Sequence, residues 1–371
     1  MSTVFCTAGK ASEEQEGLPV NLILSLLLAL VSTFTFAVFV WWIDLWEREP
    51  FPEAAARVLY GGVPAVIYVL LLGSSLGMLS LPEAVVQAPL VEEAVKGLGV
   101  LFVFSTTYRK LTSGDEVSDR VRSWSLSSDH IIDLLRRNST GEREIDTPLD
   151  GLIYGALVGF GFALTENFVY YGSFEGGPGF LFQFVILRSV LLGFGHALFS
   201  GMFGLGIGIG RNREGPGRVL IPLAGYGLAV LMHGAYNFLA VQQSLGLLVL
   251  YGYLLAGFGV TLAILVLQER IWIQTELEDE INRGILTQAE VDLAVNFGYR
   301  LLVDLNCLGK DRERWLGKYA FLQSCAELAL KKRRLRAGQT KEVSYGELKD
   351  LRNRIYHLRE HAMVDLLSEG A

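Results

Sequence analysis

The chain has 371 residues, of which 51% are hydrophobic, and its formal net charge is −7. Charged residues are sparse up to about position 270 and dense after it, and the apolar residues before that point come in blocks of about 20, the length of helix that crosses a bilayer. This distribution argues against a single soluble domain and predicts a multi-pass membrane protein with a soluble tail. The net charge identifies no partner, because topology sets where each sign lies, and we expect no nucleic-acid partner.

The cysteines and the N-terminus exclude two further classes. Cys6, Cys307 and Cys325 form neither a CxxC motif nor a paired framework, so the sequence supports no disulfide scaffold and no zinc ribbon. Glu13 and Glu14 precede the first apolar run, where a secretory signal would have basic residues. We therefore expect no cleaved signal peptide.

Seven candidate membrane spans follow one another along the chain. They cover about residues 18–43, 55–80, 81–106, 149–172, 180–209, 219–241 and 245–268. The segments on one side of these spans contain Lys10 as their only basic residue, whereas the other side receives clusters such as Arg136, Arg137 and Arg143. The positive-inside rule makes the second side cytoplasmic, and Trp41, Trp42 and Trp46 at the inner end of the first span fit an interfacial aromatic belt.

The predicted fold is therefore an all-α membrane bundle in the cell membrane, with the N-terminus outside and the C-terminus in the cytoplasm. Residues 1–17 form an outer tail, 18–268 the membrane domain with a cytoplasmic loop at 107–148, and 269–371 a cytoplasmic helical domain. In that loop, Ser128–Leu135 fits either a short amphipathic helix or solvated chain. In the last domain, Thr287 with Glu290 and Ser344 with Glu347 have the spacing of capping boxes that begin helices. The helix predicted at 311–336 ends in a basic cluster, Lys331–Arg336, which suits lipid head groups or a solvated helix end.

Glycines recur every four residues in two of the spans. Gly151, Gly155 and Gly159 form one series, and Gly204 with Gly208 belongs to another. Small residues at this spacing let helix backbones approach closely in lipid. We expect these glycines to lie at helix contacts in the core of the bundle.

Ionisable residues interrupt the third span. Glu92, Glu93 and Lys96 lie in an otherwise apolar run from Leu81 to Phe104. An ionised group at the centre of a bilayer costs roughly 2.5–3.5 kcal/mol, so three together need a reason. Glu92 and Lys96 are one helical turn apart and can pair, whereas Glu93 points about 100° away and needs another partner.

Three further polar sets lie inside the spans. They are Glu166-Asn167 with Tyr170, His196 two turns after Arg188, and His233 one turn before Asn237. A carboxylate in an apolar site can act as a base toward water, and donors on one helix face can stabilise an oxyanion, as peptide hydrolysis requires. Two histidines and a carboxylate are also sufficient for a catalytic Zn²⁺ with one open position. Both chemistries remain open from the residues alone.

This order of motifs resembles the PrsW family of intramembrane proteases. The matching motifs are Glu-Glu-x-x-Lys from Glu92, Asp-Gly-x-x-Tyr-Gly from Asp150 with Glu-Asn-x-x-Tyr from Glu166, the mid-helix His196, and His-x-x-x-Asn from His233. Asp44–Pro50 after the first span is also similar, and the likeness covers about residues 20–268. The PrsW family belongs to a larger superfamily with the CAAX prenyl endopeptidases and the Abi proteins, in which the CAAX branch carries arginine one position after the place of Lys96.

The resemblance implies a CAAX-protease-like helical core and an endopeptidase that cuts a membrane-anchored protein, such as an anti-sigma factor. It assigns the catalytic site to Glu92, Glu93, Glu166, His196, His233 and Asn237. The partners would be a membrane protein or peptide substrate and the lipid bilayer, and an oligomer is compatible with the sequence. The alternatives are an ion or proton transporter that uses the buried carboxylates and a non-catalytic scaffold that binds a peptide or lipid; haem bound by the two histidines is a further alternative.

Two schemes for activating water are compatible with this site. With Zn²⁺ as cofactor, Glu93, His196 and His233 would be the ligands and Glu92 the base. Without a metal, Glu92 would be the base, Glu93 and His196 would orient it, and His233 with Asn237 would hold the oxyanion. We favour the metal-free scheme at this point, because asparagine is a poor zinc ligand and Lys96 would compete with a divalent cation.

The charge distribution predicts the topology directly. In the variants Ser139→Cys and Ser173→Cys, position 173 should react with an impermeant thiol reagent on intact cells and position 139 should not, because the loops that contain them have opposite basic content. Permeabilised cells provide the control, in which both positions should react. Labelling of position 139 in intact cells would contradict the seven-span topology.

Overall fold

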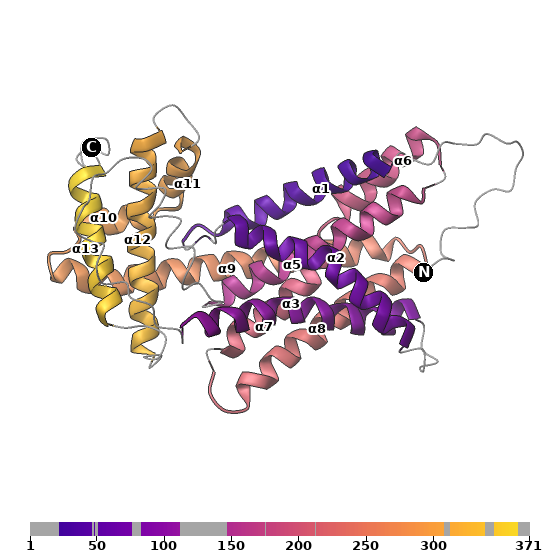
Figure 1. Cartoon of the computed structure of the whole chain (residues 1–371), viewed down its shortest axis with the longest axis horizontal. Helices are drawn as coiled ribbons and strands as arrows, with labels where there is room; N and C mark the ends of the chain where they lie inside the picture. The colour runs from indigo at the N-terminus through magenta and orange to yellow at the C-terminus, as the bar shows by residue number, and fades with distance from the viewer. Residues whose placement is uncertain are drawn as a thin grey trace, which may run out of the picture. The chain divides into compact units, whose positions relative to one another are not determined.

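The computed structural model describes residues 22–46, 48, 51–75, 83–111, 147–174, 176–211, 213–307, 312–337 and 345–362, and in these ranges the chain is helical and has no β-strand (Figure 1). The elements are α1 (Leu22–Ile43), α2 (Phe51–Ser75), η1 (Glu83–Gln87), α3 (Ala88–Leu111), α5 (Pro148–Gly172), α6 (Pro178–Val185), η2 (Ile186–Leu191), α7 (Gly195–Arg211), α8 (Gly217–Val241), α9 (Gly246–Asn282), α10 (Gln288–Ala294), α11 (Phe297–Asn306), α12 (Arg312–Arg336) and α13 (Tyr345–Ala362). The two η elements are π-helical. The prediction of an all-α chain is confirmed for this part of the sequence.

Among the described residues, four helices are long and apolar enough to cross a membrane, namely α1, α5, α8 and α9. They correspond to four of the seven candidate spans, and the remaining three stay predictions. The candidate span at 180–209 consists of three helical segments, α6, η2 and α7, with residues 192–194 between the last two. Glycine is needed at this break, because a Cβ atom on Gly193 would lie 1.9 Å from the carbonyl oxygen of Ser189.

The distribution of side chains on α1 is that of a helix in lipid. Small or polar residues such as Ser25, Ala29 and Thr33 point into the protein, whereas large ones such as Val31 and Phe34 are exposed. A water-soluble helix does the reverse, burying its large apolar side chains. Small residues at the contact and large ones outside are typical of helices that associate within a bilayer.

The helix α5 is the centre of the membrane bundle, since it packs against α1, α2 and α7 and is buried along most of its length. Its glycines lie at the predicted contacts. A Cβ atom on Gly151 would lie 2.2 Å from the carbonyl oxygen of Gly204, and one on Gly155 would lie 2.2 Å from that of Ser200. A Cβ atom on Gly161 would lie 1.8 Å from the carbonyl oxygen of Val58 in α2. The helices α7 and α2 thus approach the backbone of α5 at positions where no larger residue fits.

The chain divides into two compact units. One contains α1, α2, most of α3, and α5 to α8 with the first part of α9; the other joins Asp44–Pro50 with the chain from Ala263 onward. The predicted boundary at residue 269 therefore falls within α9, which continues to Asn282 as one helix. The predicted helix at 311–336 is α12, and the capping box of Thr287 and Glu290 begins α10 as expected. Ser344 and the segment Ser128–Leu135 lie outside the described residues.

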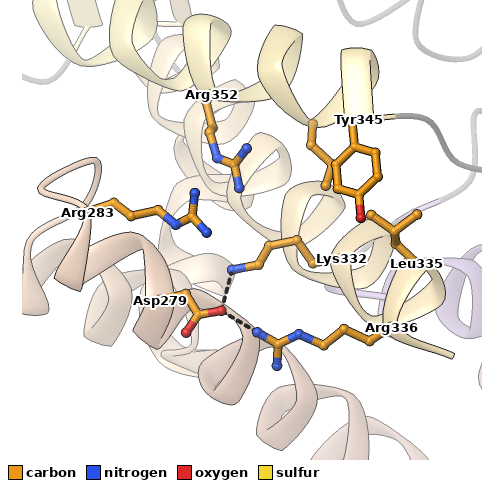
Figure 2. A pocket seen from close by; sticks show the side chains of 8 residues that line it. Asp279, Arg283, Lys332, Leu335, Arg336, Tyr345 and Arg352 are labelled. Carbon is orange, nitrogen blue, oxygen red and sulfur yellow. Dashed lines mark hydrogen bonds and ion pairs between the residues drawn. The ribbon is translucent and has the colours of Figure 1, made fainter.

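In the second unit, basic residues near the end of α12 form ion pairs with acidic residues of α9 (Figure 2). Lys332 pairs with Glu280 at 2.8 Å, and Arg336 pairs with Asp279. Arg352 from α13 makes a bidentate ion pair with Glu280, in which Nε donates to Oε2 and Nη2 donates to Oε1, both at 2.8 Å. Burial raises the pKa of Glu280, but its hydrogen bonds to Arg352 and Lys332 outweigh burial and lower the pKa to about 2. Lys332 is therefore paired inside the protein, whereas the side chain of Arg336 is 52% exposed and fits the solvated helix end. The lipid contact stays a prediction.

The close approach of α5 and α7 predicts the effect of adding one methyl group. Gly155→Ala should destabilise the folded protein by about 1–3 kcal/mol, because its Cβ would lie too close to backbone atoms of α7 to be accommodated without a shift. The matched control is Gly252→Ala in α9, where no atom lies within 4 Å of the added Cβ. Thermal unfolding in detergent measures both variants. Equal unfolding temperatures for Gly155→Ala and Gly252→Ala would contradict the predicted contact.

Candidate active site

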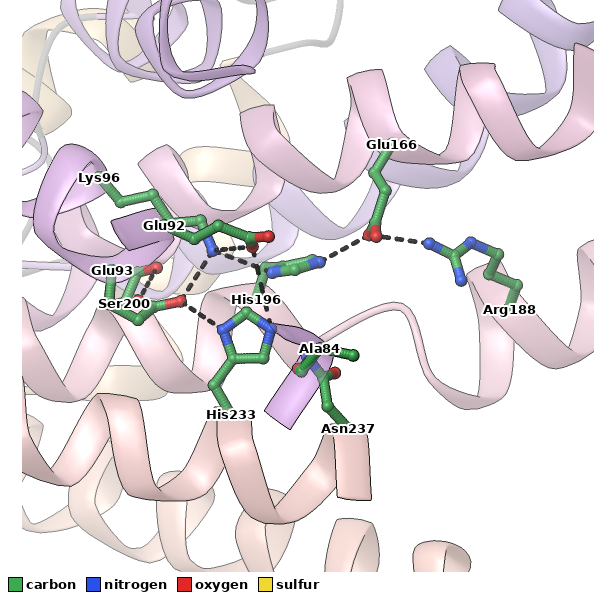
Figure 3. Close-up of polar contacts among 10 residues, drawn as sticks. All are labelled: Ala84, Glu92, Glu93, Lys96, Glu166, Arg188, His196, Ser200, His233 and Asn237. Carbon is green, nitrogen blue, oxygen red and sulfur yellow. Dashed lines mark hydrogen bonds and ion pairs between the residues drawn. The ribbon is translucent and has the colours of Figure 1, made fainter. Parts of the chain in front are cut away.

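Polar side chains from four helices, α3, α5, α7 and α8, meet inside the first of the two units (Figure 3). Glu92, Glu93 and Lys96 come from α3, and all three are buried. Glu166 comes from α5, His196 from α7 and His233 from α8, so every predicted set contributes to one cluster. The structure thus brings together five of the six predicted catalytic residues.

Glu93 is fully buried and contacts three polar side chains. The Nζ atom of Lys96 lies 2.7 Å from its Oε1, and the hydroxyl of Ser200 donates to its Oε2 at 2.9 Å. The Nδ1 atom of His233 lies 3.0 Å from Oε1. An ionised carboxylate only accepts hydrogen bonds, so Nδ1 of His233 carries the hydrogen. The other ring nitrogen of His233, Nε2, therefore has a free lone pair, and it lies 3.9 Å from Oε2 of Glu92.

Glu166 orients the second histidine in the same way. Its Oε2 lies 2.7 Å from Nε2 of His196 and 2.8 Å from the guanidinium of Arg188. Arg188 also donates to Oδ1 of Asn167 at 2.8 Å and covers the ring of Tyr170 at 3.7 Å. Because Glu166 accepts from Nε2 of His196, the lone pair of that ring lies on Nδ1.

Arg188 and Ser200 are functional neighbours that the sequence did not assign. Arg188 offered a signal, since it is an isolated basic residue in an apolar segment, two turns before His196. No sequence signal pointed to Ser200, because serine and glycine are both common at helix contacts in membranes. The Arg188 and Glu166 side chains are 24% and 18% exposed, so the cluster is reached from their side rather than from Glu93, which is 0% exposed.

The residues present fit a metal ion. Glu92, His196 and His233 each offer one ligand atom, and these atoms lie within 4.8 Å of one another. The Oε2 atom of Glu92 is buried and makes no hydrogen bond in the described part of the chain. Ligand atoms of one tetrahedral Zn²⁺ are about 3.3–3.6 Å apart, because each is about 2.0–2.2 Å from the ion, so each pair of ligand atoms would have to move closer by at most about 1.5 Å. A carboxylate on the far nitrogen of each histidine is the usual support of such ligands.

Lys96 lies among the same atoms. Its Nζ is 3.0 Å from Nδ1 of His196 and 3.5 Å from Oε2 of Glu92, and it covers the ring of Phe162 at 4.0 Å. An ammonium group can only donate, so Nδ1 of His196 accepts from Lys96, which agrees with the tautomer that Glu166 imposes. Lys96 and a metal ion would therefore use the same lone pair.

Asn237 is the predicted residue that lies apart from the cluster. Its side-chain amide donates to the backbone carbonyl of Ala84 in η1 at 2.8 Å, as Figure 3 shows. π-Helical turns are rare and often lie at functional sites. In this structure Asn237 connects α8 to η1, the segment immediately before the helix that carries Glu92.

Comparisons with known proteins identify the family. The family described as PrsW family intramembrane metalloprotease matches residues 26–267, which contain all the residues of the cluster. Protease PrsW of Shouchella clausii (strain KSM-K16) is 32% identical over 108 residues, which are 29% of this chain and 46% of that protein. The chain thus matches less than half the length of this relative, and no solved structure matches. Because the family match extends over well more than half of the chain, the chain belongs to the PrsW family of intramembrane metalloproteases.

Proposed function

We propose that the protein is an intramembrane endopeptidase that hydrolyses a peptide bond in a membrane-anchored protein, at a metal ion held by Glu92, His196 and His233. The observation that carries this proposal is the pairing of each histidine with its own carboxylate, Glu166 for His196 and Glu93 for His233. These pairs leave one ring nitrogen of each histidine near Glu92, whose Oε2 makes no hydrogen bond in the described part of the chain. Of these two nitrogens, Nδ1 of His196 accepts from Lys96. Family membership supports the same chemistry.

A Zn²⁺ ion in such a site would lower the pKa of a bound water and polarise the carbonyl of the substrate. The chain's own residues provide the conditions for this chemistry. Glu93 and Glu166 fix the tautomers and ring orientations of the two histidines, and Arg188 holds Glu166 in place. Burial of Glu92 keeps bulk water from its unsatisfied oxygen, which strengthens its interaction with a cation.

This assignment differs from both schemes expected from the sequence: the zinc scheme has Glu93 as the ligand and Glu92 as the base, and the favoured scheme uses no metal. The contacts of Glu93 support a positioning role instead, because Lys96, Ser200 and His233 already occupy its oxygens. One oxygen of Glu92 makes no hydrogen bond in the described part of the chain, whereas both oxygens of Glu93 accept hydrogen bonds. Helical spacing alone could not separate the two residues, since it shows only that they point to different faces.

The metal-free scheme is the second candidate, and the position of Lys96 favours it. Its ammonium already supplies a positive charge among Glu92, Glu93 and His196, so the cluster has a cation without a metal. In that scheme Glu92 is the base toward water, and His233 is a donor to the developing oxyanion. Asn237 would have to leave the carbonyl of Ala84 before it could act as the second donor.

The substrate, the topology and the role of the second unit belong to the proposal as well. We infer a multi-pass protein of the cell membrane with seven spans, its N-terminus outside and its C-terminus in the cytoplasm. The substrate class is a membrane-anchored protein, for which an anti-sigma factor is one candidate. A scaffold or transporter would also bury charged groups, but neither needs two oriented histidines that face a free carboxylate. The second unit contains none of the residues in this cluster, and we assign it to partner choice or assembly.

Proteolysis is tested with Glu92→Gln in full-length protein. New protein termini within or beside apolar segments should appear in membranes that contain the active protein, and Glu92→Gln should slow their formation on the order of 10²- to 10⁴-fold, because both schemes require this carboxylate. The control is Glu278→Gln, which changes an exposed glutamate of α9. Mapping of peptide termini by mass spectrometry measures the outcome. Equal sets of new termini with Glu92→Gln and with the unmodified protein would refute the proposed activity.

The metal assignment predicts an order of zinc affinities. Glu92→Gln should abolish stoichiometric zinc binding, whereas Glu93→Gln and Glu166→Gln should weaken it by about 10- to 100-fold, as expected for residues that support ligands. Zinc titration of purified, chelator-treated protein measures these affinities directly, without an activity assay. The reverse order for Glu92 and Glu93 would restore the sequence-based ligand set. Absence of stoichiometric zinc from all forms, with cleavage unaffected by chelator, would favour the metal-free scheme.

A further inference from the structure

The short helix α11 turns an apolar face away from the protein. Phe297, Leu302 and Leu305 are 51%, 48% and 56% exposed, and Leu301 between them is half-buried. At about 100° per residue these four side chains and Gly298 occupy one arc of about 140° that contains no polar residue. An apolar stripe of this width normally faces a protein core. Here it is the outer face of a ten-residue helix.

The opposite face of α11 is fixed by Arg300, which is buried. Its guanidinium donates to the backbone carbonyls of Ala294 at 2.7 Å, Leu45 at 2.7 Å and Leu322 at 2.8 Å. The same group lies over the ring of Trp46, 4.9 Å from its centre. Three carbonyl acceptors and an aromatic ring account for one buried cation, so this face is part of the folded core of the second unit.

A second contact ties α11 to the same short segment. Arg48 pairs with Asp304 of α11 at 2.6 Å, and both side chains are nearly buried. Arg300 and Asp304 are one helical turn apart, so Leu45 and Arg48 hold α11 along its length rather than at one point. Burial lowers the pKa of the Arg48 guanidinium, but the neighbouring Tyr319 and the hydrogen bond to Asp304 outweigh burial, so the net shift is upward.

The segment that holds α11 lies where two apolar helices end. Leu45 is two residues after Ile43, the last residue of α1, and two residues reach at most about 7 Å. The indole of Trp46 donates to the backbone carbonyl of Val266 at 3.1 Å, and Val266 lies in the last apolar turns of α9. Trp41 and Trp42 precede this segment in α1, and tryptophan is enriched at the level of lipid head groups. The tether of α11 is therefore at the membrane–water boundary of two candidate spans.

We propose that α11 is an interfacial helix, and that the bilayer covers its apolar face of Phe297, Leu301, Leu302 and Leu305. Such a helix lies in the plane of the interface with its apolar side about 5–10 Å into the head-group and acyl boundary. The proposal depends on the membrane location of α1 and α9 and not on the proposed catalysis, so failure of one leaves the other intact. It gives the second unit a fixed attachment to the lipid surface.

Spin labels on α11 in the full-length protein test the proposal. Leu302→Cys and Leu305→Cys are labelled in a Cys6→Ser, Cys307→Ser background and reconstituted in phosphatidylcholine vesicles. Cys325 can remain, because it is buried and burial raises the pKa of its thiol to about 12. The control label is placed at Tyr356→Cys in α13, which has a similar exposure of 53%. Oxygen partitions into lipid and a nickel chelate stays in water, so the ratio of their collision rates with the label reports the surroundings.

We expect the oxygen-to-nickel ratio at positions 302 and 305 to exceed that at position 356 several-fold. Vesicles without anionic lipid should suffice, because the proposed contact is apolar. Equal ratios at all three positions would show that water covers α11, and this would overturn the proposal. A third outcome is that neither reagent reaches the labels at 302 and 305 and that a second labelled molecule broadens their spectra. This would place another copy of the chain on the apolar face of α11, and it would overturn the proposal equally. Continued protection of Cys325 from labelling confirms that each variant is folded.

Discussion

The ionised carboxylate of Glu93, fully buried within the membrane unit, determines how the surrounding helices are arranged. A buried charge is tolerated only when donors compensate for the water it has lost, and Glu93 obtains one from its own helix and one each from α7 and α8. These contacts set the register of three helices around one group. Glu92, the preceding residue, is also buried, but its Oε2 makes no hydrogen bond in the described part of the chain, so that oxygen is the chemically available atom of the site.

The glycine contacts and the polar cluster belong to one interface. A Cβ atom on Gly155 would strike the carbonyl of Ser200, and one on Gly159 would lie 2.3 Å from the carbonyl of His196. Ser200 is the donor to Glu93, and His196 is the partner of Glu166. The close approach of α5 and α7 therefore brings the histidine of one helix to the carboxylate of the other. Packing and chemistry are coupled here, because the distance from His196 to Glu166 depends on the absence of side chains at the contact.

The sequence predicts this site well where a single helix is enough to define it, and poorly where partners come from elsewhere. Stranded charges in apolar segments identify Glu92, Glu93, Glu166, His196 and His233 as members of a cluster. Spacing along α3 cannot show which glutamate meets three donors, since those donors come from other helices. For the same reason the pairs of Lys332 and Arg336 with acidic residues of α9 are absent from any local pattern. Asn237 has the right motif, yet its amide binds the carbonyl of Ala84, which only the path of η1 reveals.

The relation between Lys96 and a metal ion follows from the lone pair on Nδ1 of His196. That lone pair can accept from the ammonium of Lys96 or bind a cation, but not both, because each imidazole nitrogen has a single lone pair. Without a metal, Lys96 balances the charge of the two carboxylates and keeps the site folded. With a divalent ion present, the same ammonium would add a third positive charge against Glu92 and Glu93, so it must turn away. The affinity of the site for a metal is therefore set by the free-energy difference between the metal-bound site and the metal-free site. Lys96 stabilises the metal-free site.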